Sequence, residues 1–290
     1  QIEVVLPEPD PASSNRTYDW DGKLRGDPSS RYVMMAVAGM RESLRVPFIG
    51  ANDNDADRFG GEDGTGILNP NHVLCVLFDY LAAHRNFPAS MGVGRTIGTT
   101  HLLDRIAADH GRPAYEVNVG FKYYVDGLKT GKYVLAGEES AGVSFPRRDG
   151  SLWVTEKDGI AAVLLMMEIM AATGKEIGTL YRELEQKYGL YQYEREDRPA
   201  RPEQKARLTQ LATDPGQVKA LLAGKKIAGR TIEQMVIGDG VKVVLSGGVW
   251  VLKRASGTEN IIKDYREEQG DSLATARKAS EEIGAYLGLN

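Results

Sequence analysis

Acidic residues alternate in one short loop, with carboxylates at Asp53, Asp55 and Asp57 and an arginine at Arg58. On an extended backbone alternate side chains point to one side, so these carboxylates repel one another strongly unless a cation lies among them. Hard oxygen donors with open coordination positions suit Mg²⁺ that also takes a phosphate oxygen. A calcium EF-hand does not fit, because its glycine position is Arg58 and its final glutamate position is Gly64. The loop predicts a Mg²⁺ site, with a solvated acidic turn as the alternative.

A second polar loop, Gly137 to Gly142, follows an apolar run and reads G-E-E-S-A-G. Glycine at both ends allows sharp turns and a close approach of backbone to ligand. Glu138 and Ser140 can accept or donate hydrogen bonds on one side, as neighbouring sugar hydroxyls require. The alternative is a polar turn whose glutamates face water, and the loop alone favours that alternative.

A third loop concentrates hydrogen-bond donors suited to an anion. It runs from Arg254 to Glu259, and Lys263 follows on the next predicted strand. A guanidinium, two hydroxyls and backbone N–H groups beside a glycine form a typical phosphate cradle. The candidate phosphate-binding residues are Arg254, Ser256, Gly257, Thr258 and Lys263. An exposed Ser/Gly turn is the alternative, and the density of donors disfavours it.

Alternating strand and helix patterns must position the first two loops. Strands are predicted at 2–6, 47–51, 91–93, 115–119 and 133–136. Helices are predicted at 31–44 after the caps Ser29 and Ser30, at 71–84 with Asn71 as the cap, and at 100–110 and 121–128. A long helix is expected to begin at Thr155, with Asp158 as its capping-box partner. This alternation indicates α/β domains with a mostly parallel or mixed sheet.

The pattern changes after Tyr188. The charged, proline-containing stretch 194–204 is interpreted as a linker. Strands are predicted at 240–245, 249–253 and 261–265, the first two joined as a hairpin at 246–248, and a closing helix at 272–287. We therefore expect three parts, 1–70, 71–193 and 194–290, of which the last is a small α+β domain.

Composition narrows the possible functions. The net charge of −4 and the pI of about 5.7 give no sign of a nucleic-acid surface. A single cysteine, Cys75, excludes an internal disulfide and fits a reducing, cytoplasmic compartment, where it is expected to be a small buried hydrophobe. The most apolar stretch, 159–172, contains Glu168 and is too short to cross a membrane, so no membrane partner is expected.

Taken together, the three loops resemble the α-D-phosphohexomutase superfamily. The matching motifs, in chain order, are D-x-D-x-D-R at 53–58, G-F-K at 120–122, G-E-E-S at 137–140 and R-x-S-G-T-E at 254–259. Asn69-Pro70-Asn71-His72 and the run 119–122 are especially similar to bacterial phosphoglucomutases. The resemblance covers essentially the whole chain.

The resemblance implies a fold and a set of residue roles. The family has four domains, and this chain would carry the end of the second, then the α/β/α third and the fourth. Asp53, Asp55 and Asp57 would bind Mg²⁺, and Arg58 would orient the phosphoserine side. Lys122 would be a general acid or base near the transferring group. Glu138 and Ser140 would bind sugar hydroxyls, while Arg254, Ser256, Gly257 and Thr258 would hold the non-reacting phosphate.

The implied activity is the interconversion of glucose 1-phosphate and glucose 6-phosphate through a phosphoserine and glucose 1,6-bisphosphate. The family's T-x-S-H-N-P serine motif does not occur in this sequence, so the chain alone is predicted to be inactive and to need the missing N-terminal domains. A homodimer is a further possibility. The alternatives are a mutase for mannose or glucosamine phosphates, which the paired glutamates of G-E-E-S disfavour, and a non-catalytic module that binds sugar phosphates.

Overall fold

The structure is a computed structural model that describes residues 2–5, 17–19 and 22–289. It divides into two compact units. Unit 1 holds residues up to 94 together with 103–115 and 121–183, and unit 2 holds 95–102, 116–120 and 184–290. The predicted boundaries 1–70, 71–193 and 194–290 stay predictions. In the described part of the chain, no helix is both long and apolar enough to span a membrane.

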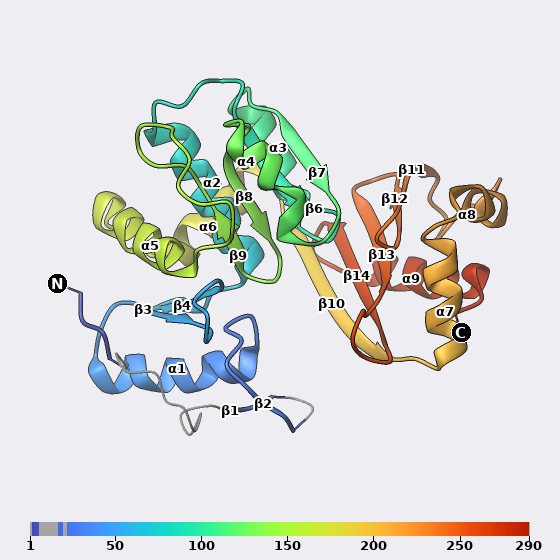
Figure 1. Ribbon diagram of the computed structural model, residues 1–290, viewed down its shortest axis with the longest axis horizontal. Helices are drawn as coiled ribbons and strands as arrows, with labels where there is room; N and C mark the ends of the chain where they lie inside the picture. The colour runs from blue at the N-terminus through green and yellow to red at the C-terminus, as the bar shows by residue number, and fades with distance from the viewer. Residues whose placement is uncertain (1, 6–16, 20–21, 290) are drawn as a thin grey trace. The chain divides into compact units, whose positions relative to one another are not determined.

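The first part of unit 1 is a small antiparallel sheet with helices packed on it (Figure 1). Its strands are β3 (Ile49–Asn52), β4 (Phe59–Asp63) and β5 (Gly66–Ile67), in that order. Helix α1 (Arg31–Leu44) contacts β3 and β4, and the side chain of Ser30 caps it by accepting a hydrogen bond from the Tyr32 amide. The predicted cap Ser30 is thereby confirmed.

The predicted strand 2–6 is wrong where it can be assessed. Residues 2–5 form no strand, and residue 6 lies outside the described residues. Two short antiparallel strands, β1 (Thr17–Tyr18) and β2 (Leu24–Arg25), precede helix α1, where no strand was predicted.

A four-stranded sheet follows, with helices between its strands. Its members are β6 (Gly92–Thr96), β7 (Ala114–Val117), β8 (Tyr133–Glu138) and β9 (Gly142–Ser144), in the order β7-β6-β8-β9. Helices α3 (Leu102–Asp109) and α4 (Val125–Lys129) lie between its strands in the chain. Helix α2 (Pro70–His84) precedes the first of these strands, and α5 (Gly159–Thr173) and α6 (Ile177–Tyr188) follow the last. Buried Cys75 lies on α2, as predicted. This mixed α/β organisation confirms the predicted fold class.

Three helix predictions need correction. Helix α2 begins at Pro70 and is capped by Asn69 rather than Asn71, because proline fits the first helical position, where no N–H is needed. Helix α5 begins at Gly159, so Asp158 is its N-cap and not a capping-box partner; its carboxylate accepts from the Ala161 amide at 2.8 Å. The predicted helix 121–128 is divided into a 3₁₀ turn, η1 (Phe121–Tyr123), and α4.

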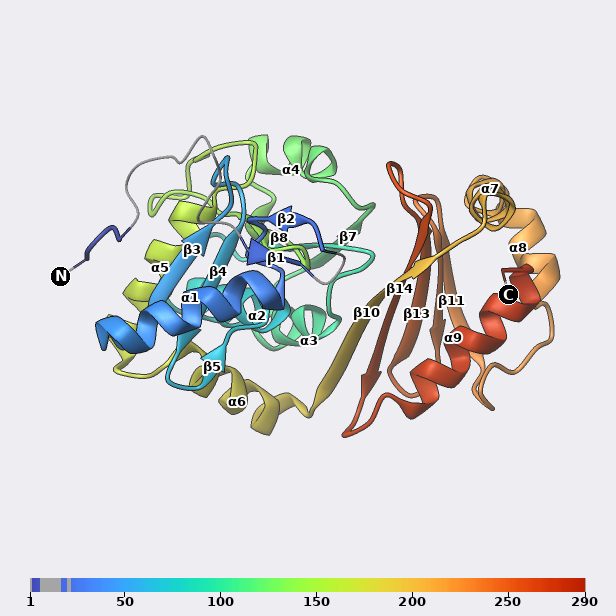
Figure 2. The same cartoon turned by 90° about the horizontal axis from the view of Figure 1, so that it is seen from below.

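Unit 2 is dominated by an antiparallel sheet with helices α7, α8 and α9 on one face (Figure 2). The strand order is β10-β14-β13-β12-β11. The strands are β10 (Tyr191–Pro199), β11 (Ile232–Ile237), β12 (Val241–Leu245), β13 (Val249–Ala255) and β14 (Ile261–Gln269). The helices are α7 (Pro202–Leu211), α8 (Pro215–Leu222) and α9 (Ala274–Leu287), which pack on the sheet over one apolar core. The small α+β domain and its 246–248 hairpin are confirmed.

The predicted linker 194–204 is wrong, because most of it is strand β10 paired with β14 along its full length. Its charges have partners: Glu194 pairs with Arg266 and Arg277, and Glu196 also pairs with Arg266. A charged strand can therefore be mistaken for a linker when the residues that pair with its charges are distant in sequence.

Candidate functional site

The acidic loop of unit 1 gathers its three carboxylates. One carboxylate oxygen from each of Asp53, Asp55 and Asp57 lies within 4.8 Å of the others. Ala56 adopts a left-handed backbone with φ of 57°, which bends the loop so that the aspartates converge. The Arg58 amide donates to Asp53 at 3.0 Å. Three hard oxygen donors at this separation fit a divalent cation that keeps positions open for other ligands.

Burial and like charge also act on these carboxylates. Burial raises the pKa of Asp53 and repulsion from Asp57 and Asp55 adds to it, whereas the hydrogen bond from the Arg58 amide lowers it. The Arg58 side chain forms an ion pair with Asp27 and lies 3.8 Å from both Asp53 and Asp57. Arg58 therefore contacts the acidic cluster, and Asp27 is a partner that the sequence did not indicate; the role of Arg58 toward a phosphoserine stays a prediction.

Backbone pairing joins the acidic loop to the G-E-E-S loop within unit 1. Arg58 and Gly142 form an isolated β-bridge, and the Phe59 amide donates to the Ala141 carbonyl at 3.0 Å. Glu138 is buried and accepts a hydrogen bond of 3.2 Å from the Ser140 hydroxyl. The two loops predicted to bind metal and sugar are thus immediate neighbours.

Lys157 connects the same two loops, and sequence reasoning missed it. Its ammonium lies 2.8 Å from the Asp57 carboxylate, while its stem packs against Gly142, where an added Cβ would lie 2.2 Å from the lysine Cδ. Burial acts to lower the pKa of Lys157, but the hydrogen bond and charge of Asp57, with smaller effects of Glu156 and Glu138, together outweigh it and raise the pKa. No local signal identified it, because Glu156-Lys157-Asp158 resembles the start of an ordinary helix.

Lys122 is placed differently. It is exposed on η1, and its ammonium lies 5.1 Å from the centroid of the neighbouring Tyr123 ring. Within the described residues it forms no ion pair with the acidic loop, so the cation that contacts that loop from outside it is Lys157.

The phosphate-binding candidates lie in unit 2: Arg254 is near the end of β13, Lys263 is on β14, and the turn between the strands holds Ser256, Gly257 and Thr258. Ser256 is buried: its amide donates to the Ile261 carbonyl at 3.1 Å, and its hydroxyl accepts from the Glu259 amide at 3.3 Å. Arg254 lies opposite Lys263 in the strand register. In the described part of the chain, the exposed amides of Gly257 and Thr258 donate to no protein group, which leaves them for solvent or an anion.

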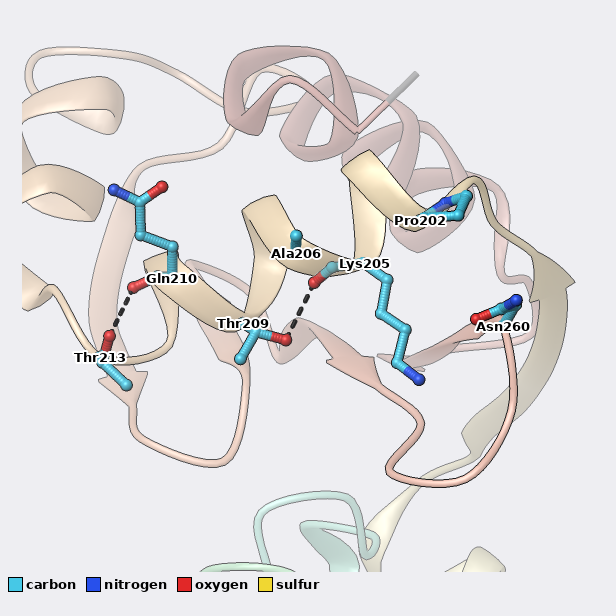
Figure 3. Close-up of a pocket in the computed structure, with 7 residues that line it drawn as sticks. All are labelled: Pro202, Lys205, Ala206, Thr209, Gln210, Thr213 and Asn260. Atoms are coloured by element: carbon cyan, nitrogen blue, oxygen red, sulfur yellow. Dashed lines mark hydrogen bonds between the residues drawn. The ribbon is translucent and has the colours of Figure 1, made fainter.

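Helix α7 supports this loop from one side. The Lys205 ammonium donates to the Glu259 carbonyl at 2.9 Å. Figure 3 shows the shallow pocket beside it, where the hydroxyls of Thr209 and Thr213 are occupied by carbonyls of the helix and its end. The pocket is lined by Pro202, Lys205, Ala206, Thr209, Gln210, Thr213 and Asn260. Since the two threonine hydroxyls and the lysine ammonium already have partners, we assign the pocket a supporting role only.

Comparison with known proteins identifies the family. Residues 69–188 match the family model of the phosphoglucomutase/phosphomannomutase alpha/beta/alpha domain III. The chain is 44% identical over 270 residues to a phosphoglucomutase from Komagataeibacter xylinus, an alignment that covers 91% of this chain and 48% of that protein. Residues 69–188 belong to the phosphoglucomutase/phosphomannomutase family. It spans about half the length of the curated relatives it matches.

Solved structures of this phosphohexomutase fold agree. The open form of pp63/parafusin, a phosphoglucomutase from Paramecium, matches with a TM-score of 0.63 and 26% identity, covering 84% of this chain and 46% of that one. The N-acetylphosphoglucosamine mutase of Aspergillus fumigatus, solved in complex with GlcNAc-6P and magnesium, matches with a TM-score of 0.54 at 15% identity. It covers 83% of this chain and 52% of its own, and shares the fold alone.

Proposed function

We propose that this chain is the metal- and substrate-binding half of a phosphoglucomutase, which interconverts glucose 1-phosphate and glucose 6-phosphate. The observation that carries the proposal is the direct pairing of the acidic loop with the G-E-E-S loop, bridged by Lys157 and Asp57 at 2.8 Å. A phosphoryl group transferred at this place would meet a cation site, a sugar-hydroxyl site and a lysine together.

In the proposed reaction, a phosphoserine supplied by the missing N-terminal domains gives its phosphoryl group to one sugar hydroxyl. The resulting glucose 1,6-bisphosphate turns and returns its other phosphoryl group to the serine. Asp53, Asp55 and Asp57 would hold Mg²⁺, which when bound stabilises negative charge on the transferring group. Glu138 and Ser140 would orient the sugar hydroxyls, Arg58 would stand beside the cation site, and Lys122 would move the proton of the reacting hydroxyl.

The phosphate loop would hold the phosphate that does not react. Arg254 and Lys263 supply charge, and the amides of Gly257 and Thr258, with the Ser256 hydroxyl, supply directed hydrogen bonds. Each phosphate of the bisphosphate must occupy this loop in turn. The affinity of the loop for phosphate therefore has to be high enough to orient the sugar phosphate and low enough to let it dissociate.

The test is a coupled assay of glucose 1-phosphate conversion with Mg²⁺ and glucose 1,6-bisphosphate. The mass-verified chain is measured alone and with the N-terminal half of a relative added. No activity alone and recovery on addition are expected. Turnover by the chain alone would overturn the proposed need for an external serine. Binding of glucose phosphates without turnover in either preparation would favour the non-catalytic module, and preferential conversion of mannose 1-phosphate or glucosamine 1-phosphate would favour the related mutases.

A further inference from the structure

Arg254, the predicted phosphate ligand of unit 2, has a carboxylate partner outside its own loop. Its Nε donates to the Asp239 carboxylate at 2.7 Å. Both side chains are partly exposed, at 21% for Arg254 and 28% for Asp239. An ion pair at such a surface adds little stability by itself, so its effect on the direction of the guanidinium is the more informative property.

The β11–β12 turn is built to bring Asp239 to this place. The turn reads Gly238-Asp239-Gly240 and is closed by a hydrogen bond of 3.2 Å from the Gly238 amide to the Gly240 carbonyl. Gly240 has a φ of 152°, and a Cβ added there would lie 2.6 Å from the Lys253 carbonyl oxygen. Only glycine allows so close an approach to β13. The turn therefore packs on the backbone immediately before Arg254.

Strand register places a second cation beside the pair. Arg254 on β13 lies directly opposite Lys263 on β14. Like charges in directly opposite positions repel each other and destabilise a strand pair. Asp239 supplies a negative charge on the other side of Arg254, which offsets that repulsion while no anion is bound.

We propose that Asp239 is a positioning residue, which orients the Arg254 guanidinium toward the phosphate of a sugar phosphate; this rests on the proposed function. An arginine side chain has many rotamers, and fixing one of them on binding costs free energy. Asp239 fixes the guanidinium before the ligand arrives, so that less of this cost falls on binding. The contact needs a hydrogen-bond acceptor, and it does not need the full charge.

This last property separates positioning from simple electrostatics. In Asp239→Asn the amide oxygen can still accept from Nε, whereas Asp239→Ala removes the acceptor. Both variants remove one negative charge. If Asp239 acted only through its charge, both would bind an anion more tightly, because an electrostatic competitor is gone. If it orients Arg254, the alanine variant binds more weakly and the asparagine variant does not.

The experiment is calorimetric titration of glucose 1,6-bisphosphate into the 290-residue chain and its variants. We expect Asp239→Ala to raise Kd about tenfold and Asp239→Asn to keep it within about threefold of the wild type. Glu233→Ala is the matched control, because it removes an exposed carboxylate from the same hairpin. Unfolding curves of all variants check that the sheet is intact.

A second readout does not depend on the ligand. The Arg254 Nε–H signal in nitrogen-15 NMR is assigned with Arg254→Lys. Its relaxation should report a mobile guanidinium in Asp239→Ala and a rigid one in the wild type and in Asp239→Asn. Equal affinity of wild type and Asp239→Ala, tighter binding by Asp239→Ala, or equal weakening by both Asp239 variants would each overturn the positioning role. A folded wild-type chain that binds no bisphosphate would instead refute the proposed function, and the NMR comparison would still decide whether Asp239 orders Arg254.

Discussion

Lys242 of β12 donates a hydrogen bond of 2.6 Å to Glu116 at the end of β7, although the two residues stand far apart in sequence. The lysine side chain is completely buried, and its ammonium also lies 2.8 Å from the His101 ring and 4.6 Å from the Trp250 ring centroid. Burial and the charge of Arg95 lower the pKa of Lys242 to about 8, although Glu116 opposes them. Both partners are charged at neutral pH, so unit 2 contains a desolvated ion pair.

Breaking this pair should destabilise unit 2 strongly. Glu116→Gln leaves the buried ammonium without its anion, for which we expect a loss of about 3–5 kcal/mol in the free energy of unfolding. Lys242→Met is expected to cost less, because Arg95 still pairs with Glu116 at 2.5 Å. Urea unfolding followed by Trp250 fluorescence measures both losses.

The double variant Glu116→Gln/Lys242→Met distinguishes pairing from packing. With the pair removed as a unit, the double loss should be smaller than the sum of the single losses by more than about 1 kcal/mol. Additive losses would show that the two residues stabilise unit 2 independently. Lys278→Met, which alters an exposed lysine on α9, should change the unfolding free energy little.

Lys157 is expected to weaken Mg²⁺ binding by the isolated chain. Its ammonium lies 2.8 Å from the Asp57 carboxylate. A divalent cation bound there is therefore repelled by the lysine charge and must compete with the lysine for the Asp57 oxygens. Lys157→Met should therefore tighten Mg²⁺ binding about tenfold, whereas Asp57→Asn should weaken it by a similar factor. Titration with Mg²⁺ at low ionic strength measures both changes.

Lys175→Met serves as the control for this experiment, since Lys175 is half-exposed and pairs with Glu183 on α6. It should leave Mg²⁺ affinity unchanged. Weaker Mg²⁺ binding by Lys157→Met would contradict the competition and show that the lysine instead holds Asp57 in the binding geometry.

Asp158 should contribute to stability by capping helix α5, and it should take no part in the reaction. One of its oxygens accepts from the Ala161 amide and the other from the Trp153 ring nitrogen, each at 2.8 Å. Asp158→Ala removes both bonds and should lower the free energy of unfolding by about 1–2 kcal/mol. Asp158→Asn retains an N-cap acceptor and should recover most of that loss in thermal unfolding. Equal losses in the two variants would argue against capping.

The three motifs could be located from the sequence because each is local, and their ligands stay predictions. Asp53, Asp55 and Asp57 converge through the bend of a single loop, and Ser256 accepts a hydrogen bond from within its own turn. The order of the motifs along the chain also indicated the family, because three motifs in a fixed order are far more specific than one acidic run. The strand–helix alternation that gave the fold class is likewise a local property of the chain.

Long-range partners could not be predicted from the sequence. Lys157 reaches Asp57 only after α5 packs beside the acidic loop, and Asp239 reaches Arg254 only through strand register. Strand β10 was missed for the same reason: Glu194 pairs with Arg266 on β14 and Arg277, and no nearby residue reveals those partners. The start of α5 was misplaced because Thr155 and Asp158 are both residues that favour an N-cap, and the structure uses Asp158.

His72 gives the chain a pH-dependent stability. Burial lowers the pKa of His72 to about 4, and its ring stacks on Tyr181 with centroids 3.6 Å apart. The unfolded chain therefore binds a proton between about pH 6.5 and 4 that the folded chain does not, so stability falls as pH falls through this range. Between pH 7.5 and 5 the wild type should lose about 2 kcal/mol more than His72→Phe, which keeps an aromatic stack without titrating. Urea unfolding at the two pH values measures the difference. Equal losses in the two proteins would mean that His72 accepts a proton in the folded state as readily as in the unfolded one.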